Sequence, residues 1–243
     1  MNEPEDWSLL VETPSLLGVA KPAGLLSVPG RGMAKSDCLI ARVQQRFPEA
    51  RIVHRLDQAT SGVMVLARTA EAHRHLGWQF ERREVSKRYV AIVAGHLEPE
   101  EGEIDAPLRK ALADGPRHVV DPVHGKPAVT RWRVTARTTL GELRASLVAA
   151  GARAEDLLSP TADDATPLTR LDLVPLTGRS HQLRVHLAGQ GHPVLGDEFY
   201  APPATRSLSP RLLLHAEELA VRDPDEPPDE PGSSVRIERR AAW

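Results

Sequence analysis

The stretch His54-Arg55-Leu56-Asp57-Gln58-Ala59-Thr60-Ser61-Gly62 joins two apolar segments of the chain. Ile52-Val53 precedes it and residues 63–67 follow it, so the pattern predicts a strand, a sharp polar connection and a second strand. Thr60-Ser61-Gly62 supplies hydroxyl groups and a permissive backbone, which suits a tight turn. A carboxylate at Asp57 would then be aimed in one direction. The same local pattern fits an Asx turn, in which Asp57 merely caps its own loop.

The composition is that of an ordinary globular chain. Its 243 residues are enough for one large domain or two small ones, and 41% are hydrophobic and 26% charged. No apolar run approaches the length of a membrane span, and the acidic N-terminus lacks the pattern of a secretory signal. The single cysteine, Cys38, excludes an intramolecular disulfide and a cysteine zinc cluster. We therefore expect a cytoplasmic protein with no membrane association.

The charged residues are unevenly distributed. The formal net charge of −2 does not indicate a nucleic-acid partner. Between residues 74 and 88, however, Glu81 and Glu84 are outnumbered by basic residues, which are Arg74, Arg82, Arg83, Lys87 and Arg88. Such a run is typical either of a solvated helix face or of contacts to RNA phosphates, and composition leaves both interpretations open.

Apolar periodicity predicts an α+β fold in which strands outnumber helices. The expected strands span 8–12, 16–20, 87–95, 129–135, 169–176, 212–219 and, at an edge, 235–237. The expected helices are 36–47, 70–83 and 180–187, capped by Ser36, Thr69 and Ser180. We expect a single domain over residues 1–221, with a surface insertion at 138–167 that includes one helix. An acidic, proline-rich and flexible tail is expected at 222–243.

The central stretch resembles the HRLDxxTSG signature of the RluA family of RNA pseudouridine synthases. Four further segments agree in order and spacing, namely 21–26 (KPAGLL), 87–91 (KRYVA), 178–186 (GRSHQLRVH) and 191–197 (GHPVLGD). Segments 25–31, 196–201 and 211–217 are similar to the subgroup that acts on both ribosomal and transfer RNA. Few residues precede the first expected strand, so we do not expect the small RNA-binding domain that often precedes the catalytic domain in this family.

The resemblance implies a long, bent, mixed but mainly antiparallel sheet, flanked by helices and crossed by a central RNA-binding cleft. It also implies an isomerase that converts uridine to pseudouridine. This reaction oxidises nothing and loses no group, so no cofactor and no metal is expected. The implied partner is RNA, either a large-subunit ribosomal RNA loop, a transfer RNA anticodon stem-loop, or both. We expect a monomer.

The resemblance also assigns roles to individual residues. Asp57 is the catalytic carboxylate, which attacks the anomeric carbon, attacks the base, or removes a ribose proton. Arg184 pairs with it and favours its ionised form. Tyr89 stacks on the target base, and Arg55 fills the gap left by the flipped nucleotide. Arg74, Arg82, Arg83, Lys87 and Arg88 are candidates for RNA backbone contacts.

Two other functions are compatible with these motifs. A degenerate relative would bind RNA as a chaperone without catalysis, although Asp57, Tyr89 and Arg184 are all present. A nucleoside or sugar hydrolase would normally use two carboxylates, whereas this motif supplies one. His54 is expected to be a structural hydrogen-bond partner. The histidines show no metal-ligand spacing, so no metal site is predicted.

Overall fold

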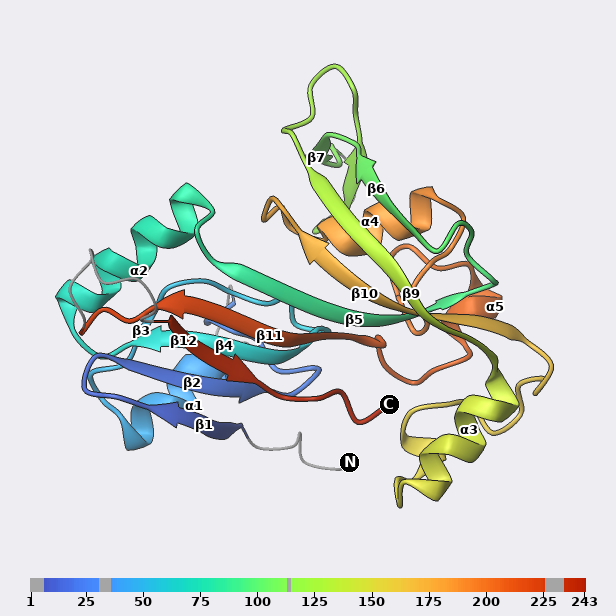
Figure 1. Cartoon of the computed structure of the whole chain (residues 1–243), viewed down its shortest axis with the longest axis horizontal. Coiled ribbons are helices and arrows are strands. Elements are labelled where there is room, and N and C mark those ends of the chain that lie inside the picture. The colour runs from blue at the N-terminus through green and yellow to red at the C-terminus, as the bar shows by residue number, and fades with distance from the viewer. Residues whose placement is uncertain (1–6, 31–35, 113–114, 226–233) are drawn as a thin grey trace. The chain divides into compact units, whose positions relative to one another are not determined.

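The computed structural model describes residues 7–30, 36–112, 115–225 and 234–243 (Figure 1). The chain divides into two compact units. The first comprises Met1–Arg88 and Ala216–Arg240, and the second comprises Tyr89–His215 and Ala241–Trp243. Each unit has its own hydrophobic core, so each is described by itself.

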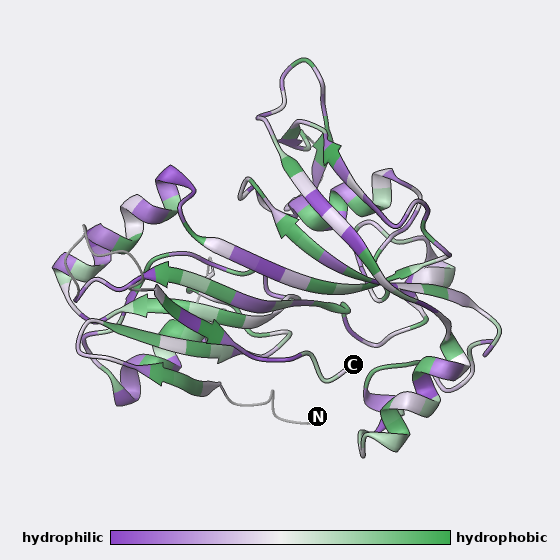
Figure 2. Ribbon diagram, in the orientation of Figure 1, coloured by the Kyte–Doolittle hydropathy of each residue, from purple (hydrophilic) through white to green (hydrophobic). Residues whose placement is uncertain are grey.

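The first unit is built on an antiparallel sheet. Its strands are β1 (Ser8–Glu12), β2 (Leu16–Lys21), β3 (Arg51–Ile52), β4 (Ser61–Ala67), β11 (Leu214–Arg222) and β12 (Ser234–Glu238). The pairing order is β1-β2-β4-β11, with β3 on β4 and β12 on β11. Every residue of β4 is buried, which explains why the segment after the central stretch is continuously apolar. Figure 2 shows the hydrophobic residues running along these strands.

Two helices belong to the first unit, α1 (Leu39–Arg46) and α2 (Ala70–Arg82). The predicted Thr69 cap of α2 is confirmed, because its hydroxyl accepts a hydrogen bond from the Ala72 amide at 3.0 Å. The prediction that Ser36 caps α1 is wrong. That helix begins one residue after Cys38, which is buried and makes no side-chain capping bond.

The second unit holds the sheet β5-β10-β9-β6, in which the paired strands β5/β10, β10/β9 and β9/β6 are antiparallel. Its strands are β5 (Ser86–Ala94), β6 (Glu101–Asp105), β9 (Val129–Thr139) and β10 (Pro167–Pro175). A separate two-stranded sheet pairs β7 (Leu108–Lys110) with β8 (His118–Val120). The helices are α3 (Leu140–Ala149), α4 (Gln182–Gly189), α5 (Pro203–Arg206) and a 3-10 turn, η2 (Ala154–Asp156). The sequence did not indicate β6, β7 and β8.

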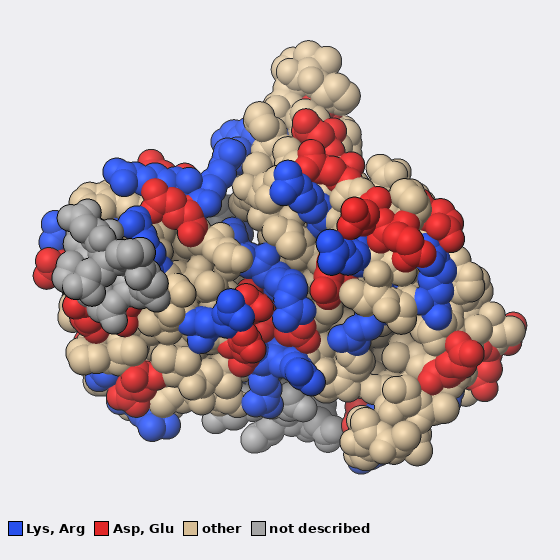
Figure 3. Space-filling model, in the orientation of Figure 1, with Lys and Arg blue, Asp and Glu red and all other residues tan. Residues whose placement is uncertain are grey.

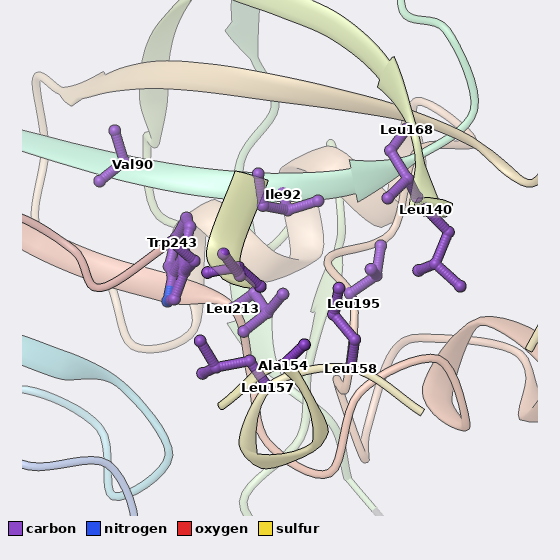
Figure 4. Packing of buried hydrophobic residues seen from close by; sticks show 11 residues of the cluster. Val90, Ile92, Leu140, Ala154, Leu157, Leu158, Leu168, Leu195, Leu213 and Trp243 are labelled. Carbon is purple, nitrogen blue, oxygen red and sulfur yellow. The ribbon is translucent and has the colours of Figure 1, made fainter. Parts of the chain in front are cut away.

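The core of the second unit includes residues that the sequence placed on the surface. Leu140, Leu147, Leu157 and Leu158 come from the predicted insertion at 138–167, yet they pack with Ile92, Leu195 and Leu213 (Figure 4). Helix α3 begins with a capping box between Thr139 and Glu142. Segment 138–167 therefore contributes Leu140, Leu147, Leu157 and Leu158 to the core, whereas Leu143 is only partly buried.

The structure describes the end of the chain on both sides of residues 226–233, which themselves lie outside the described residues. The predicted edge strand at 235–237 is confirmed by β12, and Ile237 is buried in the first unit. Trp243 is buried in the second unit, where the Arg170 guanidinium lies 5.5 Å from its ring centroid. The domain boundary at residue 221 and the flexible tail stay predictions.

The α+β prediction is confirmed, since the described chain holds a large sheet and few helices. In the part of the chain that the structure describes, no helix has both the length and the apolar character needed to cross a membrane.

Candidate active site

Residues 54–62, called here the catalytic loop, connect β3 to β4 in the first unit. A buried lysine fixes this loop to the segment that follows β2. The Lys21 ammonium is 1% exposed and donates to the carbonyl oxygens of Pro22 at 2.8 Å, Leu25 at 2.7 Å and Gln58 at 3.1 Å. A buried ammonium needs such acceptors, so these bonds hold the two segments together.

Four further hydrogen bonds join the same segments. Ser27 Oγ donates to the Leu56 carbonyl at 2.7 Å and accepts from the Leu56 amide at 3.1 Å. The Gly24 amide donates to the Gln58 carbonyl at 2.8 Å, and Gln58 Nε2 donates to the Gly24 carbonyl at 3.0 Å. Both neighbours of Asp57 in the sequence are therefore held in place.

The predicted tight turn is present. The Thr60 amide donates to the Asp57 carbonyl at 3.1 Å, which closes the turn through the main chain. Asp57 is half-buried and Arg55 is exposed. The loop thus presents the carboxylate from a braced backbone and keeps an arginine in solvent beside it.

Gly62, at the end of the loop, has a φ of 125°. This value lies in a region that side chains rarely adopt. A Cβ atom at this position would lie 2.2 Å from the Ala216 carbonyl oxygen on β11. The last residue of the TSG motif is therefore required both by its conformation and by the close approach of two strands.

His54 has a structural role, as the sequence predicts. Its Nε2 accepts a hydrogen bond from the Val65 amide at 3.1 Å, which places the ring proton on Nδ1. Its ring stacks on Phe80 of α2, with the centroids 4.4 Å apart. Burial, reinforced by the charge of Lys87, lowers the pKa of His54 to about 3. The imidazole is therefore neutral and anchors the start of the loop to α2.

Tyr89 and Arg184 belong to the second unit. Tyr89 lies on β5, opposite Leu173 of β10, and is half-buried. Arg184 lies on α4 and is 2% exposed. Its guanidinium donates from Nε to Asp197 Oδ2 at 2.7 Å and from Nη2 to Oδ1 at 2.6 Å. This bidentate pair fixes the plane of the guanidinium.

Asp197 is a site residue that the sequence did not single out. Its Oδ1 also accepts from the amides of Phe199 at 2.9 Å and Tyr200 at 3.1 Å. The aromatic rings of both residues lie with their centroids 5.2 Å from the Arg184 guanidinium carbon. The signal that was available is the Gly-Asp pair that ends segment 191–197.

The start of α4 differs from the prediction. The helix begins after His181, whose φ of 57° is in the left-handed region, and not after a Ser180 cap. His181 Nδ1 and the Tyr200 hydroxyl are hydrogen-bonded at 2.6 Å, and the same hydroxyl accepts from the His118 amide at 2.9 Å. These bonds connect the start of α4 to the loop that carries Asp197.

The five basic residues that were predicted to contact the RNA backbone differ in their exposure and in their ion pairs. Arg74, Arg82 and Arg83 are exposed. Burial lowers the pKa of Lys87, whose ammonium lies 5.6 Å from the Phe80 ring centroid. Arg88 pairs with Glu217 at 2.5 Å and with Glu218 at 3.5 Å. Among the described residues, no three His, Cys, Asp or Glu side chains come together as metal ligands.

Comparisons with known proteins agree with one another. The family model described as RNA pseudouridylate synthase matches residues 15–189. The dual-specificity RNA pseudouridine synthase RluA of Escherichia coli (strain K12) is 43% identical over 221 residues, covering 90% of this chain and 89% of that protein. The RluA protein of Yersinia pestis is 43% identical over 217 residues, covering 89% and 93%.

Solved structures show the same fold. Human RNA pseudouridylate synthase domain containing 1 matches with a TM-score of 0.74 and 24% identity, covering 98% of this chain and 84% of that one. Human RNA pseudouridylate synthase domain containing 4 matches with a TM-score of 0.66. The family model covers most of the chain and the bacterial relatives align over nearly all of it, so this chain belongs to the RNA pseudouridylate synthase family.

Proposed function

We propose that this protein isomerises uridine to pseudouridine in RNA, with Asp57 as the catalytic carboxylate. The reaction breaks the bond from the ribose anomeric carbon to N1 of the base and forms a bond from the same carbon to C5. The proton on C5 leaves as N1 gains one, so atoms and electrons balance without a co-reactant. The bacterial relatives are named dual-specificity enzymes, which supports ribosomal and transfer RNA as the substrates.

The braced catalytic loop is the observation that carries this proposal. Isomerisation requires a carboxylate held beside a sugar while the base detaches and turns, so a mobile carboxylate would lose the geometry. Lys21, Ser27 and Gln58 fix the backbone on both sides of Asp57. This rigidity serves nucleophilic attack and proton removal equally, and both roles need the ionised form.

The other site residues have separate tasks in the proposal. Arg184, with its plane fixed by Asp197, supplies a positive charge that complements the carboxylate of Asp57. Tyr89 stacks on the detached uracil and keeps water from the reactive carbon. Arg55 occupies the place of the nucleotide that leaves the stack. Asp57 and Arg55 belong to the first unit, and Tyr89 and Arg184 belong to the second.

Replacement of the carboxylate tests the proposal. Asp57→Asn should abolish isomerisation, while RNA affinity and folding stay close to wild type, because the amide keeps the shape of the side chain but cannot act as a nucleophile or base. The matched control is Asp164→Asn, since that aspartate is 68% exposed and pairs with Arg144 on the surface. Pseudouridine is mapped by chemical labelling and primer extension on an anticodon stem-loop and on a ribosomal RNA fragment.

Turnover by Asp57→Asn, once deamidation has been excluded by mass spectrometry, would contradict the assignment of Asp57. A wild-type protein that binds these RNAs without converting uridine would identify a chaperone. Release of free uracil would identify a hydrolase.

A further inference from the structure

The outer face of α2 carries an exposed tryptophan. Trp78 is 53% exposed. The other large hydrophobic side chains that are exposed in the described part of the chain are aliphatic. The opposite face of the helix buries Ala72 and Leu76 in the core of the first unit. At 100° per residue, Trp78 lies about 140° around the helix from the midpoint of Ala72 and Leu76, so its side chain points away from that core.

Two arginines flank the tryptophan at helical spacing. Arg74 precedes Trp78 by four residues and Arg82 follows it by four, so all three side chains share one side of the helix. The Arg82 guanidinium lies 5.9 Å from the centroid of the Trp78 ring. We call Arg74, Trp78 and Arg82 the Arg-Trp-Arg stripe. Figure 3 shows Lys and Arg side chains gathered over the region where Figure 1 draws α2.

Among the described residues, no carboxylate neutralises the positive charges of the stripe. Within residues 7–30, 36–112, 115–225 and 234–243, neither Arg74 nor Arg82 has a salt bridge or a side-chain hydrogen bond. Arg42 and Arg68 of the same unit, in contrast, are paired with carboxylates. Glu71 and Glu81 lie nearby on α2 without pairing to either arginine of the stripe. The stripe therefore offers two free guanidinium groups to an anionic partner.

Gly77 adds an observation from the backbone. Glycine is among the least favourable residues inside a helix, so its presence there calls for a reason. A Cβ atom at Gly77 would meet nothing within 4 Å, so no neighbour in the protein requires the glycine. A ligand can therefore approach the helix backbone at the residue that precedes Trp78.

We infer that the Arg-Trp-Arg stripe is an RNA contact outside the catalytic loop, with the Trp78 indole stacked on an unpaired base and the two arginines on flanking phosphates. The inference rests on the proposed function, which makes RNA the substrate. Indole faces stack on bases of any identity, and guanidinium groups bind phosphate. A tryptophan at the centre of a protein–protein interface is normally surrounded by residues that exclude water. The residues close to Trp78 on α2 include Gly77, Glu81 and Arg82, which do not form such an apolar surround.

The inner side of α2 connects this contact to the catalytic loop. His73 Nε2 is hydrogen-bonded to the Ile52 carbonyl at 2.9 Å, and Phe80 stacks on His54. Ile52 comes two residues before the start of the catalytic loop, and His54 is its first residue. RNA seated on the stripe is therefore held on the helix that anchors the segment carrying Asp57.

Binding measurements on two RNAs test the inference. One probe is a fluorescently labelled anticodon stem-loop, and the other is a fully paired duplex of the same length. Trp78→Leu should weaken stem-loop binding about 5- to 100-fold, because stacking on one base is lost, and should leave duplex binding and the salt dependence unchanged. Trp78→Phe should restore most of the affinity. Val148→Ala, at a 62% exposed position on α3, is the control and should change nothing.

The arginines have a different expected signature. Arg74→Gln and Arg82→Gln should each flatten the slope of log affinity against log salt by about 0.7 to 0.9, on both RNAs. Single-turnover isomerisation at saturating stem-loop should be unchanged by Trp78→Leu, because the stripe does not touch the reacting atoms. Conversion of uridine by the wild-type protein tests the proposed function separately.

Wild-type affinity of Trp78→Leu for the stem-loop, in a preparation that still isomerises uridine, would overturn the inference. An equal loss on the stem-loop and the paired duplex would also overturn it, because a stacking contact needs an unpaired base.

Discussion

Removal of Asp197 should destabilise the second unit strongly. The Asp197 and Arg184 side chains are 1% and 2% exposed, and the Asp197 carboxylate accepts hydrogen bonds from Nε and Nη2 of the Arg184 guanidinium and from the amides of Phe199 and Tyr200. Asp197→Ala leaves a buried cation without this partner and two amides without their acceptor. Asp197→Asn keeps the volume and one oxygen but removes the charge.

The magnitude follows from burial. Breaking a buried ion pair from one side costs about 3 to 5 kcal/mol, and each amide that loses its acceptor adds about 1 kcal/mol unless water reaches it. We therefore expect Asp197→Ala to lower the free energy of unfolding by about 5 to 7 kcal/mol, a large share of the stability of a typical domain. Asp197→Asn should cost about 2 to 3 kcal/mol. The surface control Asp164→Ala, whose aspartate is 68% exposed, should cost at most about 1 kcal/mol.

Urea unfolding followed by tryptophan fluorescence measures these values. Trp132 and Trp243 belong to the second unit, whereas Trp7 and Trp78 belong to the first. A background in which Trp7 and Trp78 are replaced by Phe therefore reports the second unit alone. If Arg184 serves Asp57 as proposed, Asp197→Asn should also lose more turnover than RNA affinity.

The reasoning is refuted if Asp197→Ala unfolds within about 1 kcal/mol of Asp164→Ala, since the buried pair would then contribute no more than a surface pair. Should Asp197→Ala fail to fold, Asp197→Asn against the same control decides the question.

Three further outcomes are expected. Gly62→Ala should lower the free energy of unfolding in urea by more than about 3 kcal/mol, or yield no soluble protein, because its Cβ would overlap the Ala216 carbonyl. The control Gly189→Ala, at a position with open space around it, should leave the stability unchanged or raise it. The folded pKa of His54, about 3, lies below its ordinary 6.5, so the unfolded chain binds more protons between these values. Stability should therefore fall by about 1.4 kcal/mol per pH unit as the pH drops below 6.5, and His54→Gln should reduce that slope; an unchanged slope would contradict a buried neutral imidazole. Tyr89→Leu should lose single-turnover rate much more than RNA affinity, and equal losses would show that Tyr89 only packs in the sheet.

The sequence was informative where function depends on neighbouring residues. The turn at Asp57, the cap at Thr69 and the structural bonding of His54 follow from patterns within a few residues, and the structure confirms each. The pairing of Arg184 with Asp197 joins residues 13 positions apart across a loop, and no periodicity reports such a contact.

The sequence also could not predict which basic side chains are exposed and which are buried or paired with a carboxylate. Lys87 and Arg88 have the same charge as Arg82, yet Lys87 is half-buried beside Phe80 and Arg88 is paired with Glu217. The sequence cannot distinguish them, because burial and pairing depend on which strand lies alongside. Leu140 and Leu158 lie in segment 138–167, which was expected to be a surface insertion, yet both are buried, because a polar neighbourhood in the chain does not exclude a buried side chain.

The bonds of Lys21 make this lysine a chemical reporter on the catalytic loop. Reagents that acylate amines need a solvent-accessible nitrogen with a free lone pair, and the Lys21 nitrogen is buried while it donates to three carbonyls, one of them in Gln58. Exposed Lys126 should be acylated at once, whereas Lys21 should react only when the loop opens. The ratio of the two rates, read by mass spectrometry, then gives the opening frequency of the loop in the native protein, and a bound RNA that closes the site should lower it.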